Sequence, residues 1–166
     1  FRDPSTVRDM WRLVEQHRIT ILGTVPTVFG ALLNSPVGET DISSIRHGFT
    51  GGAPLPTEVG RALIKTMGKP LLEGYGMTET TSFVTMLPRN GPPAGSAGIV
   101  VPHCKVKTAI LDDAGNVLRD CAVDEIGVVL MGGPGVTPGY VQTQYNAGAL
   151  LADGWLNSGD LGRFDS

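Results

Sequence analysis

The stretch "LLEGYGMTETTSF", residues 71–83, gathers polar side chains around a single carboxylate. An apolar pair that ends at paired glycines predicts a buried strand, followed by a loop whose backbone approaches something closely. In that loop Tyr75 offers an aromatic face, and Glu79 offers the charged oxygen that a hard cation such as Mg²⁺ prefers. Further hydroxyl donors and acceptors come from Thr78, Thr80, Thr81 and Ser82. These residue types favour a loop that binds a polar ligand.

Helix and strand patterns alternate upstream of this stretch. The expected elements are a helix opened by Asp3 and Pro4, a strand at about 19–22, a helix from Pro26 to Leu33, a strand at 45–49, a helix at about 59–67 closed by Gly68, and the strand that begins at Leu71. Such alternation predicts βαβ units and a parallel sheet, in which ligands gather at loops beyond the carboxyl ends of strands. The stretch at 71–83 occupies such a loop.

The pattern changes from about Pro92 onward. "CKVKTAILDDAGNVL" alternates apolar and polar residues and turns at 113–116, and "EIGVVLMGG" supplies another short strand. We therefore expect an antiparallel sheet or barrel here. A short helix at about 145–151 and a turn at "ADGW" should then lead to Asp160, which we expect in a glycine-bounded turn.

Composition excludes several classes of protein. The 166 residues, of which 41% are hydrophobic, can bury one good core but hardly two independent ones. A net charge of −3 argues against a surface for nucleic acid or anionic membranes, and no apolar run has membrane-spanning length. Cys104 and Cys121, without a signal-like segment, indicate structural thiols in a reducing compartment and favour a cytoplasmic protein. Three histidines lack metal-ligand spacing, namely His17, His47 and His103.

Three stretches in this order and spacing resemble a known family: "TGGAPLP" at 50–56, "GYGMTE" at 74–79 and "GWLNSGDLGRFD" at 154–165. With "VPTVFGALL" and "GSAGIVVPHCKVKTAILDDAG", they resemble the adenylate-forming (AMP-binding) superfamily, and most of all a fatty-acid or acyl-CoA synthetase. The resemblance covers nearly the whole chain. It implies an α/β fold, with part of a layered α/β domain and its mostly parallel sheet at 1–91, followed by a small antiparallel β-barrel-like part at 92–166.

The resemblance implies an enzyme that uses ATP and Mg²⁺ to convert a carboxylic acid into an acyl-adenylate, and then passes the acyl group to coenzyme A. By resemblance, Thr78 would contact the phosphate or the reacting carboxylate, and Glu79 would hold Mg²⁺. Asp160 would bind the ribose hydroxyls. The adenine would stack on Tyr75 and lie along its neighbours and the upstream glycine loop, which together comprise Gly51, Gly52, Ala53, Pro54, Gly74 and Gly76.

The resemblance also places an acyl pocket. Its lining would come from Phe29, Phe49, Met77 and Ser82, together with Gly52 and Gly74. These residues favour an apolar acyl chain, and no acidic residue stands where an adenylation domain would receive an amino group. A fatty or other simple carboxylic acid is therefore favoured over an amino acid, an aryl acid or a luciferin-like substrate.

Each residue also has a plainer explanation when the family is set aside. Gly51 and Gly52 could form only a tight strand-to-helix turn, and Tyr75 could belong to the core. Glu79 could be a surface or capping carboxylate, and Asp160 could be an ordinary turn aspartate. The residues alone leave these alternatives open.

The chain lacks parts that the family carries elsewhere, and we expect it to be an internal piece of the large N-terminal domain. The phosphate loop that the family has upstream and the lysine-bearing C-terminal domain are missing, and Arg163 in "GRFD" is not the family's hinge arginine. We therefore expect the 166 residues alone to be inactive and prone to self-association through exposed sheet edges. A noncatalytic binding module derived from the family is an alternative. A hydrolase built from Ser82, His47 and Asp160 lacks a nucleophile elbow and is disfavoured.

Overall fold

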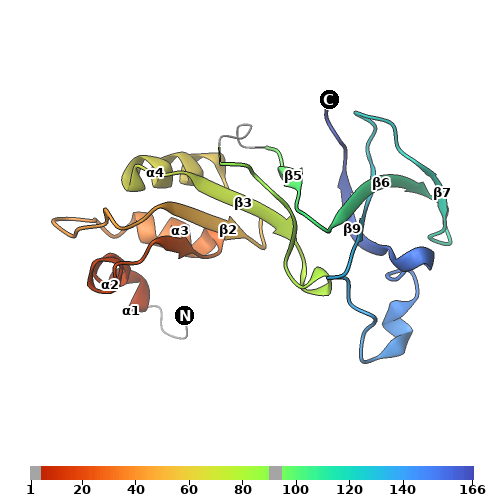
Figure 1. Cartoon of the computed structure of the whole chain (residues 1–166), viewed down its shortest axis with the longest axis horizontal. Helices are drawn as coiled ribbons and strands as arrows, with labels where there is room; N and C mark the ends of the chain where they lie inside the picture. The colour runs from red at the N-terminus through yellow and green to blue at the C-terminus, as the bar shows by residue number, and fades with distance from the viewer. Residues whose placement is uncertain (1–4, 90–94) are drawn as a thin grey trace. The chain divides into compact units, whose positions relative to one another are not determined.

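The computed structural model describes residues 5–89 and 95–166, which form two compact units (Figure 1). The first unit comprises Phe1–Tyr75 and Met86–Ile99, and the second comprises Gly76–Thr85 and Val100–Ser166. The helix start expected at Asp3 and Pro4 lies outside the described residues. The domain boundary expected after residue 91 also lies outside them, and it stays a prediction.

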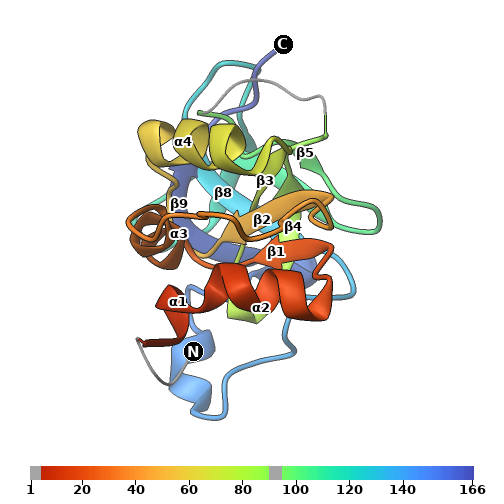
Figure 2. The same ribbon diagram turned by 90° about the vertical axis from the view of Figure 1, so that its left-hand side faces the viewer.

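The first unit combines a parallel sheet with helices, as the alternating pattern predicts. Strands β1 (Ile21–Gly23), β2 (His47–Gly51) and β3 (Leu71–Gly76) pair in the order β1-β2-β3, with Leu22 opposite Gly48 and Gly51 opposite Gly74. The helices are α1 (Ser5–Arg8), α2 (Met10–His17), α3 (Pro26–Leu33) and α4 (Thr57–Met67). Figures 1 and 2 show α2 beside β1 and α4 beside β3.

Local sequence explains where these elements begin and end. Pro26 lies in the first turn of α3, where its missing N–H leaves no intrahelical hydrogen bond unmade. Gly68 ends α4 in the left-handed conformation, at φ 63°, which glycine adopts without a steric penalty. The first predicted helix differs in one respect, because it is divided into α1, which ends at Arg8, and α2, which begins at Met10.

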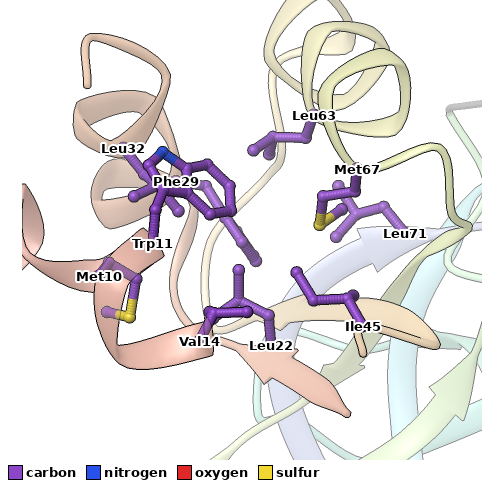
Figure 3. Close-up of a cluster of buried hydrophobic side chains, with 10 residues drawn as sticks. All are labelled: Met10, Trp11, Val14, Leu22, Phe29, Leu32, Ile45, Leu63, Met67 and Leu71. Atoms are coloured by element: carbon purple, nitrogen blue, oxygen red, sulfur yellow. The ribbon is translucent and has the colours of Figure 1, made fainter. Parts of the chain in front are cut away.

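An apolar cluster forms the core of the first unit (Figure 3). Helices α2, α3 and α4 and the segments of the sheet all contribute to it; its members are Met10, Trp11, Val14, Leu22, Phe29, Leu32, Ile45, Leu63, Met67 and Leu71. The indole N–H of Trp11 donates a hydrogen bond to the backbone oxygen of Ser35 at 2.9 Å, so the ring is buried without an unpaired donor. Each such side chain contributes about 1.5–3 kcal/mol on burial, which makes this cluster the main source of stability in the unit.

Thr50 on β2 is a buried polar residue within this unit. Its side chain is 0% exposed, and among the described residues its hydroxyl is the one buried side-chain oxygen without a hydrogen-bond partner. A buried hydroxyl without a partner lowers stability, because its contacts with water are lost and not replaced.

Replacing Thr50 with valine is therefore expected to raise the free energy of unfolding by about 1 kcal/mol, because the shape is kept and the unpaired oxygen is removed. The midpoint of urea unfolding of the purified chain measures this change. Thr80→Val is the matched control, because the Thr80 hydroxyl is also buried but makes hydrogen bonds, and its loss should lower stability. A lower midpoint for Thr50→Val would contradict the prediction.

The second unit is built on a four-stranded antiparallel sheet, with strand order β7-β6-β8-β9. The strands are β6 (Lys105–Leu111), β7 (Val117–Asp120), β8 (Gly127–Gly132) and β9 (Leu156–Gly162). Lys107 of β6 lies opposite Leu130, and Met131 of β8 lies opposite Leu156. Short 3₁₀ helices connect parts of this unit: η1 (Thr78–Thr80), η2 (Thr143–Asn146) and η3 (Ala152–Gly154). Strands β4 (Phe83–Met86) and β5 (Ile99–Val100) contain residues of both units.

The expected fold class is confirmed: a mostly parallel sheet is followed by an antiparallel part. Two local expectations are wrong. The helix expected at 145–151 is only the short η2, and Gly148 follows at φ 76°, a conformation that interrupts a right-handed helix. Asp160 lies in β9 rather than in a turn. Gly159, at φ 75°, lies where the pairing of β8 with β9 shifts register, so the glycine accommodates an irregularity within the strand.

No helix in the described ranges has the length and apolar character that crossing a membrane requires.

Candidate functional site

Strand β3 continues through the glycine pair and ends at Gly76. Gly74, Tyr75 and Gly76 therefore lie in the strand, and the expectation that Tyr75 lies in a loop is wrong. The reason is local packing, since Gly74 pairs with Gly51 of β2. A Cβ atom at Gly76 would lie 2.1 Å from the backbone oxygen of Ser82 and 2.8 Å from Phe83 Cα, so this glycine is needed for the chain to pack against itself. The contact of Tyr75 with adenine stays a prediction.

The loop after β3 is closed by Thr80. Its hydroxyl accepts a hydrogen bond from the Met77 N–H at 3.1 Å and donates one to the backbone oxygen of Ser82 at 2.8 Å. Thr80 is only 5% exposed, and its hydroxyl hydrogen-bonds to the backbone of its own loop, which gives it a structural role. Thr78 and Ser82 are exposed and remain accessible to a ligand.

Glu79 is the half-buried carboxylate of this loop. Its Oε1 atom accepts a hydrogen bond from the hydroxyl of Tyr140 at 2.8 Å. Its backbone oxygen accepts a second hydrogen bond, from the Thr137 N–H at 2.7 Å. The hydrogen bond to Glu79, with burial and the nearby negative charge, raises the pKa of the Tyr140 phenol above its ordinary value. Glu79 thus faces a protonated donor at neutral pH.

Tyr140 is a residue that the sequence analysis missed. It is the last residue of the proline- and glycine-rich run "GGPGVTPGY" at 132–140, and it lies 61 positions from Glu79 along the chain. The run itself signals a loop, but no local pattern states which segment that loop contacts.

The chemistry of Glu79 fits a magnesium ligand. Protein-bound Mg²⁺ commonly uses one or two carboxylates together with substrate phosphates and water. In the described ranges no Lys, Arg or His forms an ion pair with Glu79. The same residues contain no group of three or more His, Cys, Asp or Glu side chains that could hold a metal ion. Among the described residues, Glu79 would therefore be a single carboxylate ligand of the kind that Mg²⁺ combines with phosphates and water.

The upstream glycine loop lies in the first unit, between β2 and α4. Gly52, Ala53 and Pro54 are exposed, and Gly52 adopts φ 81° with open space where a Cβ atom would stand. The loop is fixed at its far end, because the Leu55 N–H donates to Oε1 of Glu73 at 3.2 Å. Glu73 lies on β3 opposite Thr50 of β2 and was also missed by the sequence analysis. This arrangement leaves a backbone edge of the loop accessible, as a base-binding role requires.

Asp160 is exposed on β9, within a network of short-range hydrogen bonds. Its N–H donates to the hydroxyl of Ser158 at 3.1 Å, and the Gly159 N–H donates to Oδ1 of Asn157 at 2.9 Å. The Ser158 hydroxyl in turn donates to the backbone oxygen of Val129 on β8 at 2.8 Å. The backbone at Asp160 is thereby fixed, which suits a side chain that orients a ligand.

The residues assigned to the acyl pocket lie in different settings. Phe29 is fully buried in the apolar core of the first unit, next to Leu32 in α3. Phe49 lies on β2 opposite Leu72 of β3 and is half-buried. Met77 and Ser82 flank η1 in the second unit. The structure thus places Met77 and Ser82 in the same loop as Thr78 and Glu79. The pocket role of the six residues assigned to the lining stays a prediction: Phe29, Phe49, Gly52, Gly74, Met77 and Ser82.

The combination of a mostly parallel sheet and a separate antiparallel sheet is that of adenylate-forming enzymes. O-succinylbenzoate coenzyme A synthetase from Bacillus subtilis, solved in complex with ATP and magnesium ion, matches the chain with a TM-score of 0.79 and 30% identity; the match covers 96% of this chain and 32% of that one. Among curated sequences, the chain is 39% identical to marinolic acid–CoA ligase from Pseudoalteromonas sp. over 100% of its own length. It is 32% identical to a long-chain-fatty-acid–CoA ligase from Salmonella typhimurium over 98% of its own length.

The chain belongs to the family of AMP-binding enzymes, whose sequence signature matches residues 1–141. It spans 26% and 28% of the length of the two CoA ligases named above.

Proposed function

We propose that the chain forms part of an ATP-dependent acyl-CoA ligase, which activates a carboxylic acid as an acyl-adenylate and transfers the acyl group to coenzyme A. The main support is the half-buried carboxylate of Glu79, which accepts a hydrogen bond from Tyr140 and has no cationic partner in the described part of the chain. This carboxylate lies in the "GYGMTE" stretch of a chain that belongs to the AMP-binding family.

The proposed reaction explains why these residue types are present. Attack of a carboxylate on the α-phosphate of ATP brings two anions together, so catalysis depends on positioning and on neutralisation of the phosphate oxygens. A bound Mg²⁺ would supply positive charge to those oxygens. Glu79 would hold the cation, and the exposed Thr78 hydroxyl would donate to the phosphate or the reacting carboxylate. No nucleophilic protein side chain is required.

Contacts with the nucleotide are proposed separately for residues of each unit. We assign the adenine to the loop at Gly51–Pro54 and to Gly74, Tyr75 and Gly76, and the ribose hydroxyls to Asp160. The exposed loop at Gly52 and the fixed backbone at Asp160 support these roles within each unit. The division into a part with acyl and adenine sites at 1–91 and a part with the ribose site at 92–166 belongs to the same proposal.

The substrate class is also a proposal. An apolar, fatty acid is favoured by the side chains assigned to the pocket, and a relative named above is a long-chain-fatty-acid–CoA ligase. An aryl acid is the second candidate, because the matched O-succinylbenzoate synthetase is named for an aromatic acid. A role in fatty acid metabolism and a cytoplasmic location go with the first candidate. The two free cysteines, Cys104 and Cys121, fit a reducing compartment.

Acid-dependent exchange between pyrophosphate and ATP tests the proposed function. The assay should use the full-length enzyme and a panel of fatty acids, aryl acids and amino acids, with release of acyl-CoA as a second measurement. Exchange that requires a fatty acid supports the proposal, and exchange only with an aryl acid would select the second candidate. No exchange with any acid would favour a noncatalytic binding module.

Replacing Asp160 with alanine is expected to weaken ATP binding by the full-length enzyme at least about tenfold, the effect of losing even one such bond. The carboxylate would lose charge-assisted hydrogen bonds to ribose, each contributing roughly 1.5–3 kcal/mol. Calorimetric titration with ATP measures the change. Asp153→Ala is the matched control, because Asp153 is also exposed in the second unit but has no assigned role. Equal ATP affinity of Asp160→Ala and the unchanged enzyme would count against the ribose role.

A further inference from the structure

The segment from Gly133 to Tyr140 holds the loop that carries Glu79. Three hydrogen bonds join them: Tyr140 Oη to Glu79 Oε1 at 2.8 Å, Thr137 N–H to the Glu79 backbone oxygen at 2.7 Å, and Thr81 Oγ1 to the Gly135 backbone oxygen at 2.7 Å. All of these residues belong to the second unit. The loop is thus fixed on both sides of its carboxylate by a segment more than fifty positions away along the chain.

The two segments lie so close together at Gly135 that there is no room for a side chain at this position. A Cβ atom at Gly135 would lie 2.8 Å from the backbone oxygen of Thr80, so only glycine allows this packing. Thr81 adopts φ 68°, an unusual conformation for a residue with a branched side chain, and its hydroxyl is the one that bonds to Gly135. A strained residue that is held by a long-range hydrogen bond indicates that the loop conformation is imposed by the segment at 133–140.

The backbone of Tyr140, whose side chain contacts Glu79, is itself held by a hydrogen bond. Its N–H donates to Oδ1 of Asn146 at 2.8 Å, and the neighbouring Gly139 packs against the same side chain, with its Cβ position 3.0 Å from Asn146 Nδ2. The Asn146 amide therefore anchors the backbone of Tyr140, and the phenol hydroxyl then anchors Glu79. A donor fixed at its own backbone restricts the orientation of the carboxylate more than a mobile side chain would.

We propose that Tyr140 is a positioning residue, whose hydroxyl orients the carboxylate of Glu79 toward the metal ion of a bound nucleotide; this inference rests on the proposed function. The phenol engages Oε1, and in the described residues no hydrogen bond is made to Oε2 of Glu79. One carboxylate oxygen is held by the protein and the other stays available to a cation. Partners of metal ligands have this effect in other sites, where they fix the orientation of the ligand.

Removal of the phenol hydroxyl should therefore weaken metal binding without removing the ligand. Tyr140→Phe in the full-length enzyme is expected to raise the dissociation constant for Mn²⁺, measured by electron paramagnetic resonance with a nonhydrolysable ATP analogue, by about tenfold. The Mg²⁺ concentration for half-maximal pyrophosphate exchange should rise in the same direction. Tyr145→Phe is the matched control, because Tyr145 is 60% exposed and lies outside the proposed site; it should leave both quantities unchanged.

A second variant tests the same positioning role by removing the group that holds the backbone of Tyr140. Asn146→Ala leaves the phenol in place but removes the group that holds the Tyr140 N–H, so Mn²⁺ binding should weaken by a smaller factor. In a Glu79→Gln background, Tyr140→Phe should have no further effect on the Mn²⁺ dissociation constant, since the charged ligand is already gone.

Unchanged Mn²⁺ binding in both Tyr140→Phe and Asn146→Ala would overturn the inference. A fall in thermal stability with unchanged Mn²⁺ binding would do the same, because it would show a purely structural role. These outcomes are distinct from failure of the proposed function, which would appear as absence of acid-dependent exchange in the unchanged enzyme. The Mn²⁺ measurement needs only the nucleotide analogue, so it decides the role of Tyr140 in either case.

Discussion

Replacing Glu79 with glutamine is expected to lower acid-dependent pyrophosphate exchange by the full-length enzyme about 10² to 10³-fold, the usual cost of losing one preorganised charge-stabilising group. The amide keeps the size of the carboxylate and can still accept the hydrogen bond from Tyr140, so the loop should keep its conformation. What is lost is the negative charge that favours a hard cation. The exchange rate should therefore fall far more than the thermal stability of the nucleotide-free enzyme.

Glu125→Gln provides the matched control for this substitution. Glu125 lies in the same unit, and the Arg119 guanidinium lowers the pKa of its carboxyl to about 2, so it too is charged at neutral pH. Its loss removes an ion pair at the surface and should leave exchange unchanged. If Glu79→Gln exchanged pyrophosphate at the unchanged rate under limiting Mg²⁺, the metal role of Glu79 would be refuted.

The sequence predicted most of the parallel sheet because its signals are local. Pro26 marks the start of α3, Gly68 marks the end of α4, and the apolar runs between them have strand length. The turn between β6 and β7 was predictable for the same reason, because the Asp112 carboxylate accepts hydrogen bonds from the N–H groups of Ala114 and Asn116, only two and four residues further on.

The partners of the candidate site could not be predicted in this way. Glu79 is recognisable as a lone carboxylate in a hydroxyl-rich loop, but its donor Tyr140 is brought to it by the path of the chain after β8. Thr80 was interpreted as one of several ligand hydroxyls, yet its hydrogen bonds to Met77 and Ser82 give it a structural role. A threonine hydroxyl can bind a ligand or hold the fold together, and only tertiary contacts distinguish these two roles.

The glycines of "GYG" were expected to approach another group closely. That expectation holds at Gly76, but the group is not the one expected. Two glycines at a strand end indicate that the backbone must approach something closely, and the expected neighbour was a ligand. At Gly76 the neighbour is the protein itself, since a Cβ atom would lie 2.1 Å from the backbone oxygen of Ser82. Gly76 therefore sets the path of the chain from β3 to β4, and with it the position of η1 and Glu79.

Replacing Gly76 with alanine is accordingly expected to lower the free energy of unfolding by about 3 kcal/mol, since the nearest atoms are backbone atoms of Ser82 and Phe83 that cannot rotate away. Urea unfolding of the purified chain measures the loss. In the full-length enzyme the shifted segment should also displace η1, so pyrophosphate exchange should fall even at temperatures where the protein remains folded.

Gly30→Ala is the matched control for Gly76→Ala. Gly30 lies inside α3, where a Cβ atom would meet nothing within 4 Å, so alanine should stabilise the helix by about 0.5–1 kcal/mol. Opposite effects of the same substitution at these two glycines would show that close backbone packing, rather than loss of glycine flexibility, accounts for the damage at Gly76. If Gly76→Ala were as stable as the unchanged chain, Ser82 and Phe83 would have to move freely. The loop that carries Thr78 and Glu79 could not then be preorganised for catalysis.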